Sequence, residues 1–286
     1  MQMSPTTLSP VAAPPPTPAR APGASAAHGA AEDAAQVFLD AFEPSAPAAP
    51  VTAADPDRAE KASLIRGMVR QSPDERVTDA VIDKLCAYPL DAIRAVSDYG
   101  TRIEMYDFDA GDPVPSYLPT LGDPSVVGAY NTKANVLGFD RKNADTFTVL
   151  HEFAHALDAA LCEPSASPEW RGAHTLAKHT NQIVRDYAKS DPAEYLAENT
   201  AAYLVPDANL PALVDQGIAN GALGLSDREY MQMCQNLSNG RLSTVDHEGW
   251  TLVDNLLHKR VQEGPHAEPR PAMTTAEWDA FQASRT

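Results

Sequence analysis

The chain has 286 residues, 43% of them hydrophobic, and its 22 Lys and Arg stand against 39 Asp and Glu, so the formal net charge is −17. A chain this acidic, without a basic stripe, cannot neutralise phosphates and release counterions, which argues against a nucleic acid partner. The sequence also lacks any apolar run near the 18 or more residues that a membrane-spanning helix needs.

The N-terminal segment differs in composition from the rest of the chain. Residues 1–56 are rich in Pro, Ala, Ser and Thr, and runs such as 13–18 cannot sustain a helix. We therefore predict a disordered leader over residues 1–56 and one globular domain over residues 57–286. The leader has no signal-peptide pattern. Residues 1–31, in which Arg20 is the only charged residue, resemble a bacterial type III secretion signal, which implies secretion by a non-Sec route into a host cell. A plain disordered tail on a cytoplasmic protein is the alternative.

Three helical patterns open the globular part. The first is interrupted at Ser72-Pro73. The second is expected to begin with a capping box formed by Ser72 and Glu75. The third covers residues 90–99 and should stop at Gly100, because glycine adopts the left-handed conformation that ends many helices.

Short extended segments follow the helices. Residues 103–108 alternate apolar and polar side chains, which predicts a half-buried strand. Residues 126–130 and 136–139, joined by turn-forming residues, predict a hairpin. Such a strand beside a cleft can pair with an extended peptide by β-augmentation.

The strongest chemical signal is the H-E-F-A-H motif at residues 151–155. On a helix, His151 and His155 lie on one face, where their imidazoles can bind one Zn²⁺ ion. Glu152 borders that face, as a general base for metal-bound water should. Asp158 is a candidate to accept an imidazole N–H and so orient a ligand. The alternative is a helix with two ordinary, partly buried histidines.

A catalytic zinc site also needs a third protein ligand and an open position for water. Leu161 stands six residues after His155, so the third ligand has to come from elsewhere in the chain. Glu194 and Glu198 are four apart in a helical pattern, so one can bind zinc while the other orients a histidine. Spacing leaves their order open, because Glu194 also fits a capping box at the start of that helix.

Residues 151–158, together with Tyr187 and Glu194, resemble the metallopeptidase domain of the anthrax lethal factor family and of the related clostridial Pro-Pro endopeptidases. MtfA-type bacterial peptidases are similar around residues 191–194. The resemblance covers about residues 75–205.

This resemblance implies an α+β, zincin-like metallopeptidase domain with a small sheet, an active-site helix and a helical C-terminal part. It also implies Glu194 as the third zinc ligand and Tyr187 as a catalytic phenol, which leaves Glu198 outside the ligand set.

We therefore expect a zinc-dependent endopeptidase that hydrolyses peptide bonds in a protein or peptide substrate. If the leader is a secretion signal, the protein is a secreted bacterial effector or toxin. Two other hypotheses are a zinc-fold binding protein that sequesters a partner with little turnover and a cytoplasmic housekeeping peptidase of the MtfA type.

Overall fold

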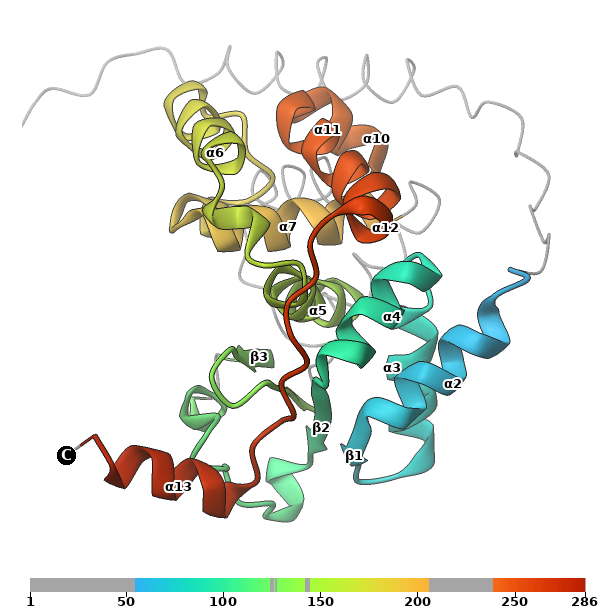
Figure 1. Cartoon of the computed structure of the whole chain (residues 1–286), viewed down its shortest axis with the longest axis vertical. Coiled ribbons are helices and arrows are strands. Elements are labelled where there is room, and N and C mark those ends of the chain that lie inside the picture. The colour runs from blue at the N-terminus through green and yellow to red at the C-terminus, as the bar shows by residue number, and fades with distance from the viewer. Residues whose placement is uncertain (1–54, 124–125, 127, 142–144, 206–238, 286) are drawn as a thin grey trace, which may run out of the picture. The chain divides into compact units, whose positions relative to one another are not determined.

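The computed structural model describes residues 55–123, 126, 128–141, 145–205 and 239–285, which belong to a compact unit spanning residues 55–286 (Figure 1). The predicted leader lies outside the described residues except for its last two, so its disorder and the domain boundary stay predictions. None of the described helices is long and apolar enough to cross a membrane.

The N-terminal part of this unit contains α2 (Arg58–Met68), β1 (Val69–Gln71), α3 (Glu75–Leu85) and α4 (Leu90–Tyr99). The predicted capping box is wrong, because the Asp74 carboxylate accepts the N–H of Val77 and caps α3. Ser72 donates its hydroxyl to the Asp74 carbonyl instead. The predicted stop at Gly100 is confirmed, with a left-handed φ of 91°.

A four-stranded sheet in the order β1-β2-β4-β3 follows, with β2 (Arg102–Tyr106), β3 (Gly128–Asn131) and β4 (Val136–Asp140). β1, β2 and β4 run parallel, whereas β3 pairs antiparallel with β4, which confirms the predicted hairpin. β3 is therefore an edge strand.

The prediction that residues 103–108 are half buried is wrong, because all residues of β2 after Arg102 are buried. On one face, Tyr106 packs in a cluster with Tyr117 and with Trp278, which is distant in sequence. On the same face Glu104 pairs with Arg102 at 2.7 Å and accepts the hydroxyls of Tyr106 and Tyr117.

Helix α5 (Thr146–Ala160) carries the H-E-F-A-H motif and lies between the sheet region and the C-terminal helices (Figure 1). The Asp145 side chain caps it by accepting the N–H of Thr148. Nearly all of its side chains are buried, since helices α3, α4 and α7 and strands β3 and β4 all contact it. The motif is therefore held in a helix that is buried by several neighbouring elements.

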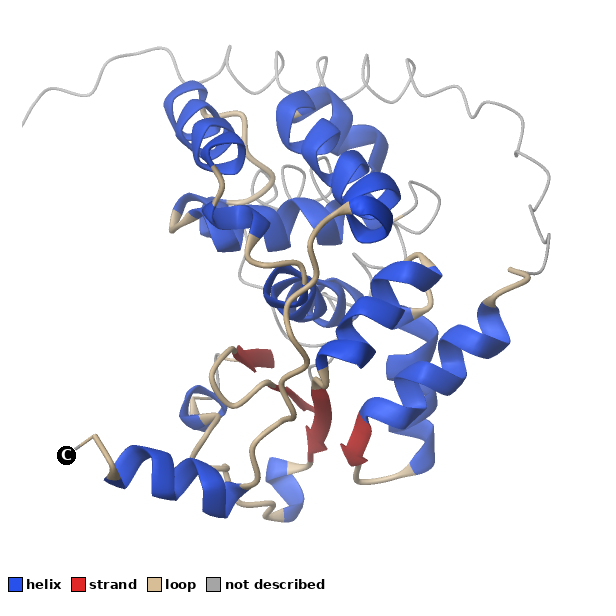
Figure 2. Ribbon diagram, viewed as in Figure 1, coloured by secondary structure: helices blue, strands red, loops and turns tan. Residues whose placement is uncertain are grey.

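The described C-terminal part is helical and comprises α6 (Pro168–Thr180), α7 (Pro192–Leu204), α10 (Asn239–Val245), α11 (His247–Asn255), the π-helix η6 (Leu256–Arg260), α12 (Val261–Glu263) and α13 (Thr275–Ala283). The strands lie near α13 and away from the other C-terminal helices (Figure 2). The predicted α+β class, with a small sheet, a helix carrying the motif and a helical C-terminal part, is confirmed.

An extended segment, residues 264–274, precedes α13 and contacts both the helices α4 and α5 and the sheet. Its backbone N–H groups donate at 2.8 Å to carbonyls at the end of α5, at the end of α4 and in the β3–β4 turn; the pairs are Ala267 to Ala160, Arg270 to Tyr99 and Met273 to Ala134. These bonds fix the sheet relative to α5, and thereby β3 relative to the motif.

Candidate metal centre

The two motif histidines face each other on α5. Their Nε2 atoms lie 3.2 Å apart, and the rings are nearly perpendicular, at 83°. His151 is buried, with 6% of its surface exposed. The predicted i, i+4 arrangement therefore brings two imidazole nitrogens to one point.

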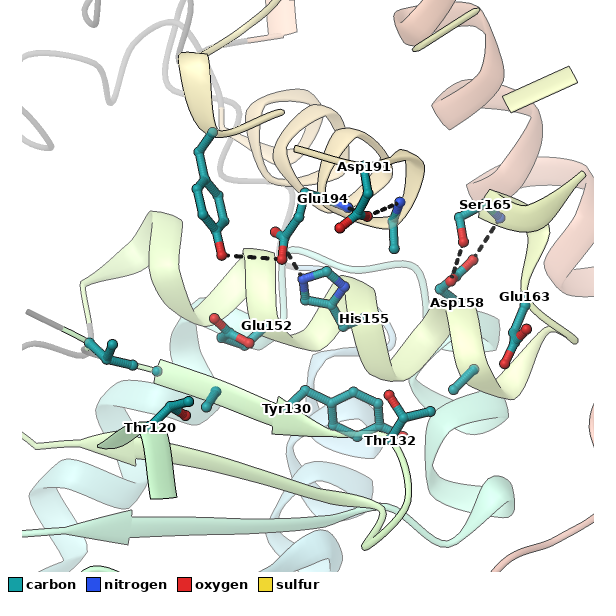
Figure 3. A pocket seen from close by; sticks show the side chains of 16 residues that line it. Thr120, Tyr130, Thr132, Glu152, His155, Asp158, Glu163, Ser165, Asp191 and Glu194 are labelled. Atoms are coloured by element: carbon teal, nitrogen blue, oxygen red, sulfur yellow. Dashed lines mark hydrogen bonds and ion pairs between the residues drawn. The ribbon is translucent and has the colours of Figure 1, made fainter. Parts of the chain in front are cut away.

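Helix α7 brings Glu194 to the same point (Figure 3). The Asp191 carboxylate caps α7 by accepting the N–H groups of Ala193 and Glu194 at 2.8 and 3.1 Å, with Pro192 in the first turn. Because Asp191 supplies the cap, the Glu194 carboxylate is left to face the histidines.

Three atoms form a nearly equilateral triangle. Glu194 Oε2 lies 3.1 Å from His151 Nε2 and 3.3 Å from His155 Nε2, and the two nitrogens are 3.2 Å apart. Ligands at about 2.0–2.1 Å from a tetrahedral zinc ion are about 3.3 Å from one another. Glu194 Oε2 is buried and no hydrogen bond of good geometry satisfies it within the described chain. The three residues therefore form a group that could hold one metal ion.

Glu198, one turn further along α7, lies near the other ring nitrogen of His151. Its Oε1 atom lies 3.3 Å from His151 Nδ1, the ring nitrogen opposite the one that faces Glu194. Glu198 is almost fully buried, with 2% of its surface exposed. In this arrangement Glu194 is on the side of the two Nε2 atoms, and Glu198 is on the side of His151 Nδ1.

The charged groups of this cluster shift one another's pKa values. Burial opposes protonation of His151, but the carboxylates of Glu194 and Glu198 outweigh it and raise the pKa of His151 to about 10. Burial likewise disfavours the Glu194 carboxylate, yet His151 and His155 hold its pKa well below the ordinary value. A cation entering the cluster must displace a proton, as metal ions do at histidine sites.

Glu152 lines a cleft of about 500 Å³ beside the cluster. Burial raises the pKa of its carboxyl. A Cβ atom at Gly128 of β3 would lie only 2.9 Å from Glu152 Cγ and from Thr148 Cγ2, so glycine lets the edge strand approach α5 closely. This role of Gly128 could not be predicted from the sequence, because only the packing of the strand on the helix reveals it.

Tyr187 lies over the cluster on the turn η4 (Asp186–Lys189). Its hydroxyl donates to Glu194 Oε1 at 3.2 Å, and its ring centroid is 6.0 Å from that of His151. Burial and the Glu194 charge raise the pKa of Tyr187 to about 12, so the phenol is a hydrogen-bond donor at neutral pH.

Asp158 lines the cleft at the far end from Glu152 (Figure 3). Its carboxylate accepts the N–H and the hydroxyl of Ser165 at 2.9 and 2.6 Å, which anchors the turn η3 (Pro164–Ala166) to the end of α5. A contact with a histidine N–H is not among the interactions found in the described residues, so that role of Asp158 stays a prediction.

No family model and no curated protein matches the sequence. Among solved structures, the Pro-Pro endopeptidase from Paenibacillus alvei is similar, with a TM-score of 0.40 and 20% sequence identity. The match covers 55% of this chain and 95% of that chain. A likeness of this size carries no argument about activity, so the functional proposal depends on the geometry of the cluster and the cleft.

Proposed function

We propose that this protein is a zinc-dependent endopeptidase. The observation that carries the proposal is the triangle of His151 Nε2, His155 Nε2 and Glu194 Oε2, which has the spacing of zinc ligands and adjoins a cleft. Two imidazoles and one carboxylate suit zinc, and three protein ligands leave a fourth position open. When bound there, zinc lowers the pKa of a water molecule towards about 7 and polarises a carbonyl oxygen.

The chain's own residues supply the proton transfers. Glu152 follows the first ligand in the motif and lines the cleft, where it can take a proton from the attacking water and deliver it to the leaving amine. The hydroxyl of Tyr187, a donor in the same cleft, can turn from Glu194 to the oxyanion that develops on the substrate.

The edge strand β3 supplies a surface for an extended peptide. Gly128, Ala129 and Tyr130 line the cleft, and β3 is paired through β4 on its other side. A peptide added to this edge would form main-chain hydrogen bonds along the strand, with its scissile bond held next to the cluster. This arrangement favours a protein or peptide substrate.

Cleavage of a peptide library tests the proposal, with Glu152→Gln compared against Glu163→Gln. Both residues line the cleft, but Glu163 follows the C-terminal end of α5, away from the motif. Glu152→Gln should lower kcat/KM by about 10²–10⁴-fold, the range of general acid–base catalysis, and should retain zinc. Glu163→Gln should cleave at close to the wild-type rate.

Cleavage by Glu152→Gln at the wild-type rate would contradict this mechanism. If no variant cleaved any peptide although a protein partner still bound, the sequestering protein would be the better description. Secretion stays a prediction from the composition of the leader, and fusion of residues 1–50 to a reporter protein would test it.

A further inference from the structure

Arg185 makes a bridge between the two helices of the candidate centre. It directly precedes η4, its backbone is extended, and its Nη1 atom lies 3.6 Å from Glu198 Oε1 on α7. Its guanidinium also lies over the ring of Phe147 on α5, 5.1 Å from the ring centroid. Since Phe147 is one turn before His151, a single side chain contacts both α5 and α7 beside the metal cluster.

On α7, Arg185 lies close to the carboxylate of Glu198. Glu198 is almost fully buried, and a buried carboxylate is costly unless it is paired. The same oxygen, Oε1, lies at ion-pair distance from both Arg185, at 3.6 Å, and His151 Nδ1, at 3.3 Å, although no hydrogen bond of good geometry to Nδ1 is found within the described chain. The other oxygen, Oε2, has no hydrogen-bond partner within the described chain. The orientation of the carboxylate therefore depends on the contacts of Oε1.

We propose that Arg185 is a positioning residue that acts through Glu198 on His151. By holding Glu198 Oε1 against Nδ1, Arg185 keeps the N–H of the imidazole at Nδ1 and its lone pair at Nε2, where Glu194 and His155 converge. This inference depends on the proposed metal site. Its consequence is that a residue outside the ligand set controls the affinity of that site for zinc.

Arg185→Met tests the proposal, because methionine keeps an apolar stem on Phe147 and removes the charge. The matched control is Lys189→Met, which removes one positive charge from the same turn; Lys189 pairs with exposed Asp186 at 2.7 Å. Zinc affinity is measured by competition with a chromogenic chelator, and Co²⁺ absorption reports the geometry of the site. Arg185→Met should bind zinc roughly 10-fold more weakly, as expected for an orienting partner, with an altered Co²⁺ spectrum. Lys189→Met should match the wild type.

A second pair of variants separates positioning from a general effect of charge. Arg185→Met added to Glu198→Gln should cause no further loss of affinity, because both changes break one chain of contacts. Arg185→Lys, which retains the charge, should recover most of the affinity. If Arg185→Met does not fold, Arg185→Gln takes its place in each comparison.

Any one of three results would overturn this inference and leave the proposed function standing. These are wild-type zinc affinity in Arg185→Met, a loss of affinity no larger than that of Lys189→Met, and additive losses when Arg185→Met is combined with Glu198→Gln. A wild-type protein that binds no zinc would overturn both.

Discussion

Helix α7 carries buried polar groups on two faces, and only one of these faces has the chemistry of a metal site. Glu194 and Glu198 point towards the histidines of α5. Tyr195 and Asn199 lie on the other side, near His174 of α6 and Asp246 before α11. Burial and polarity are therefore similar on both faces.

The difference is in how the polar groups converge. On the second face, the two oxygens of Asp246 accept the side-chain N–H of Asn199 at 3.1 Å and the backbone N–H of Gly249 at 2.9 Å. Each face also holds buried polar atoms that have no hydrogen-bond partner within the described chain, for example Asn199 Oδ1 on the second face and Glu194 Oε2 on the first. Only on the first face, among the described residues, do a carboxylate oxygen and two imidazole nitrogens lie close enough together to hold one metal ion.

The largest expected effect on zinc affinity comes from replacing Glu194, the proposed ligand on the face of α7 that points towards the histidines. Glu194→Gln should abolish tight zinc binding, because an amide oxygen carries no charge to balance the ion. Glu198→Gln should weaken binding by about 10–100-fold or less, since it removes only an orienting contact. Chelator competition on both variants measures the order. The reverse order would make Glu198 the ligand and refute the distinction between Nε2 and Nδ1.

The next effect concerns catalysis without metal binding. Tyr187→Phe should keep zinc and fold yet lower kcat by roughly 10²–10³-fold, the cost of losing an oxyanion donor. The measurements are kcat for one cleaved peptide and the zinc content of the purified variant. An unimpaired kcat would mean that Tyr187 only packs against the start of α7 through its ring.

The smallest effect should come from the second face and should change stability alone. A Cβ at Gly249 would overlap Asn199 Nδ2 and would lie 2.6 Å from Asp246 Oδ2 and 2.8 Å from the Tyr195 hydroxyl. Gly249→Ala must displace these buried groups, so it should lower the free energy of unfolding by about 1–3 kcal/mol and leave the zinc affinity of the folded protein unchanged.

Urea denaturation measures the effect of Gly249→Ala, with Gly172→Ala on α6 as the control. A Cβ at Gly172 meets nothing within 4 Å, so alanine there should be neutral or stabilise by up to about 1 kcal/mol. A loss of zinc affinity in folded Gly249→Ala would show that the two faces of α7 are not independent.

The sequence predicted several features that depend on local geometry, although the predicted capping box of Ser72 and Glu75 was wrong because Asp74 caps α3. The i, i+4 spacing of His151 and His155 is a property of any helix, and Gly100 ended a helix through its own backbone conformation. The burial of β2 could not be predicted, because Trp278 reaches it from the C-terminal helix. The alternation within residues 103–108 carries no trace of that contact.

The roles of the two glutamates show the same limit within the site. Spacing placed Glu194 and Glu198 on one face of a helix, but their order relative to the histidines depends on how α7 crosses α5. Arg185 gave no signal at all in the sequence, because its contacts with Glu198 and Phe147 join three separate elements. Tertiary packing decides which of several suitable side chains becomes a ligand, an orienting group or a bridge.

Metal content tests the central claim most directly. The purified wild-type protein, loaded and then freed of loosely bound ions, should contain about one zinc ion per chain, since three ligands on two packed helices form a preorganised site. His151→Ala and His155→Ala should each lose most of that zinc while keeping the fold. Full zinc occupancy in either variant, or a wild-type chain that retains no zinc, would contradict the claim that the cluster on α5 and α7 is a zinc site.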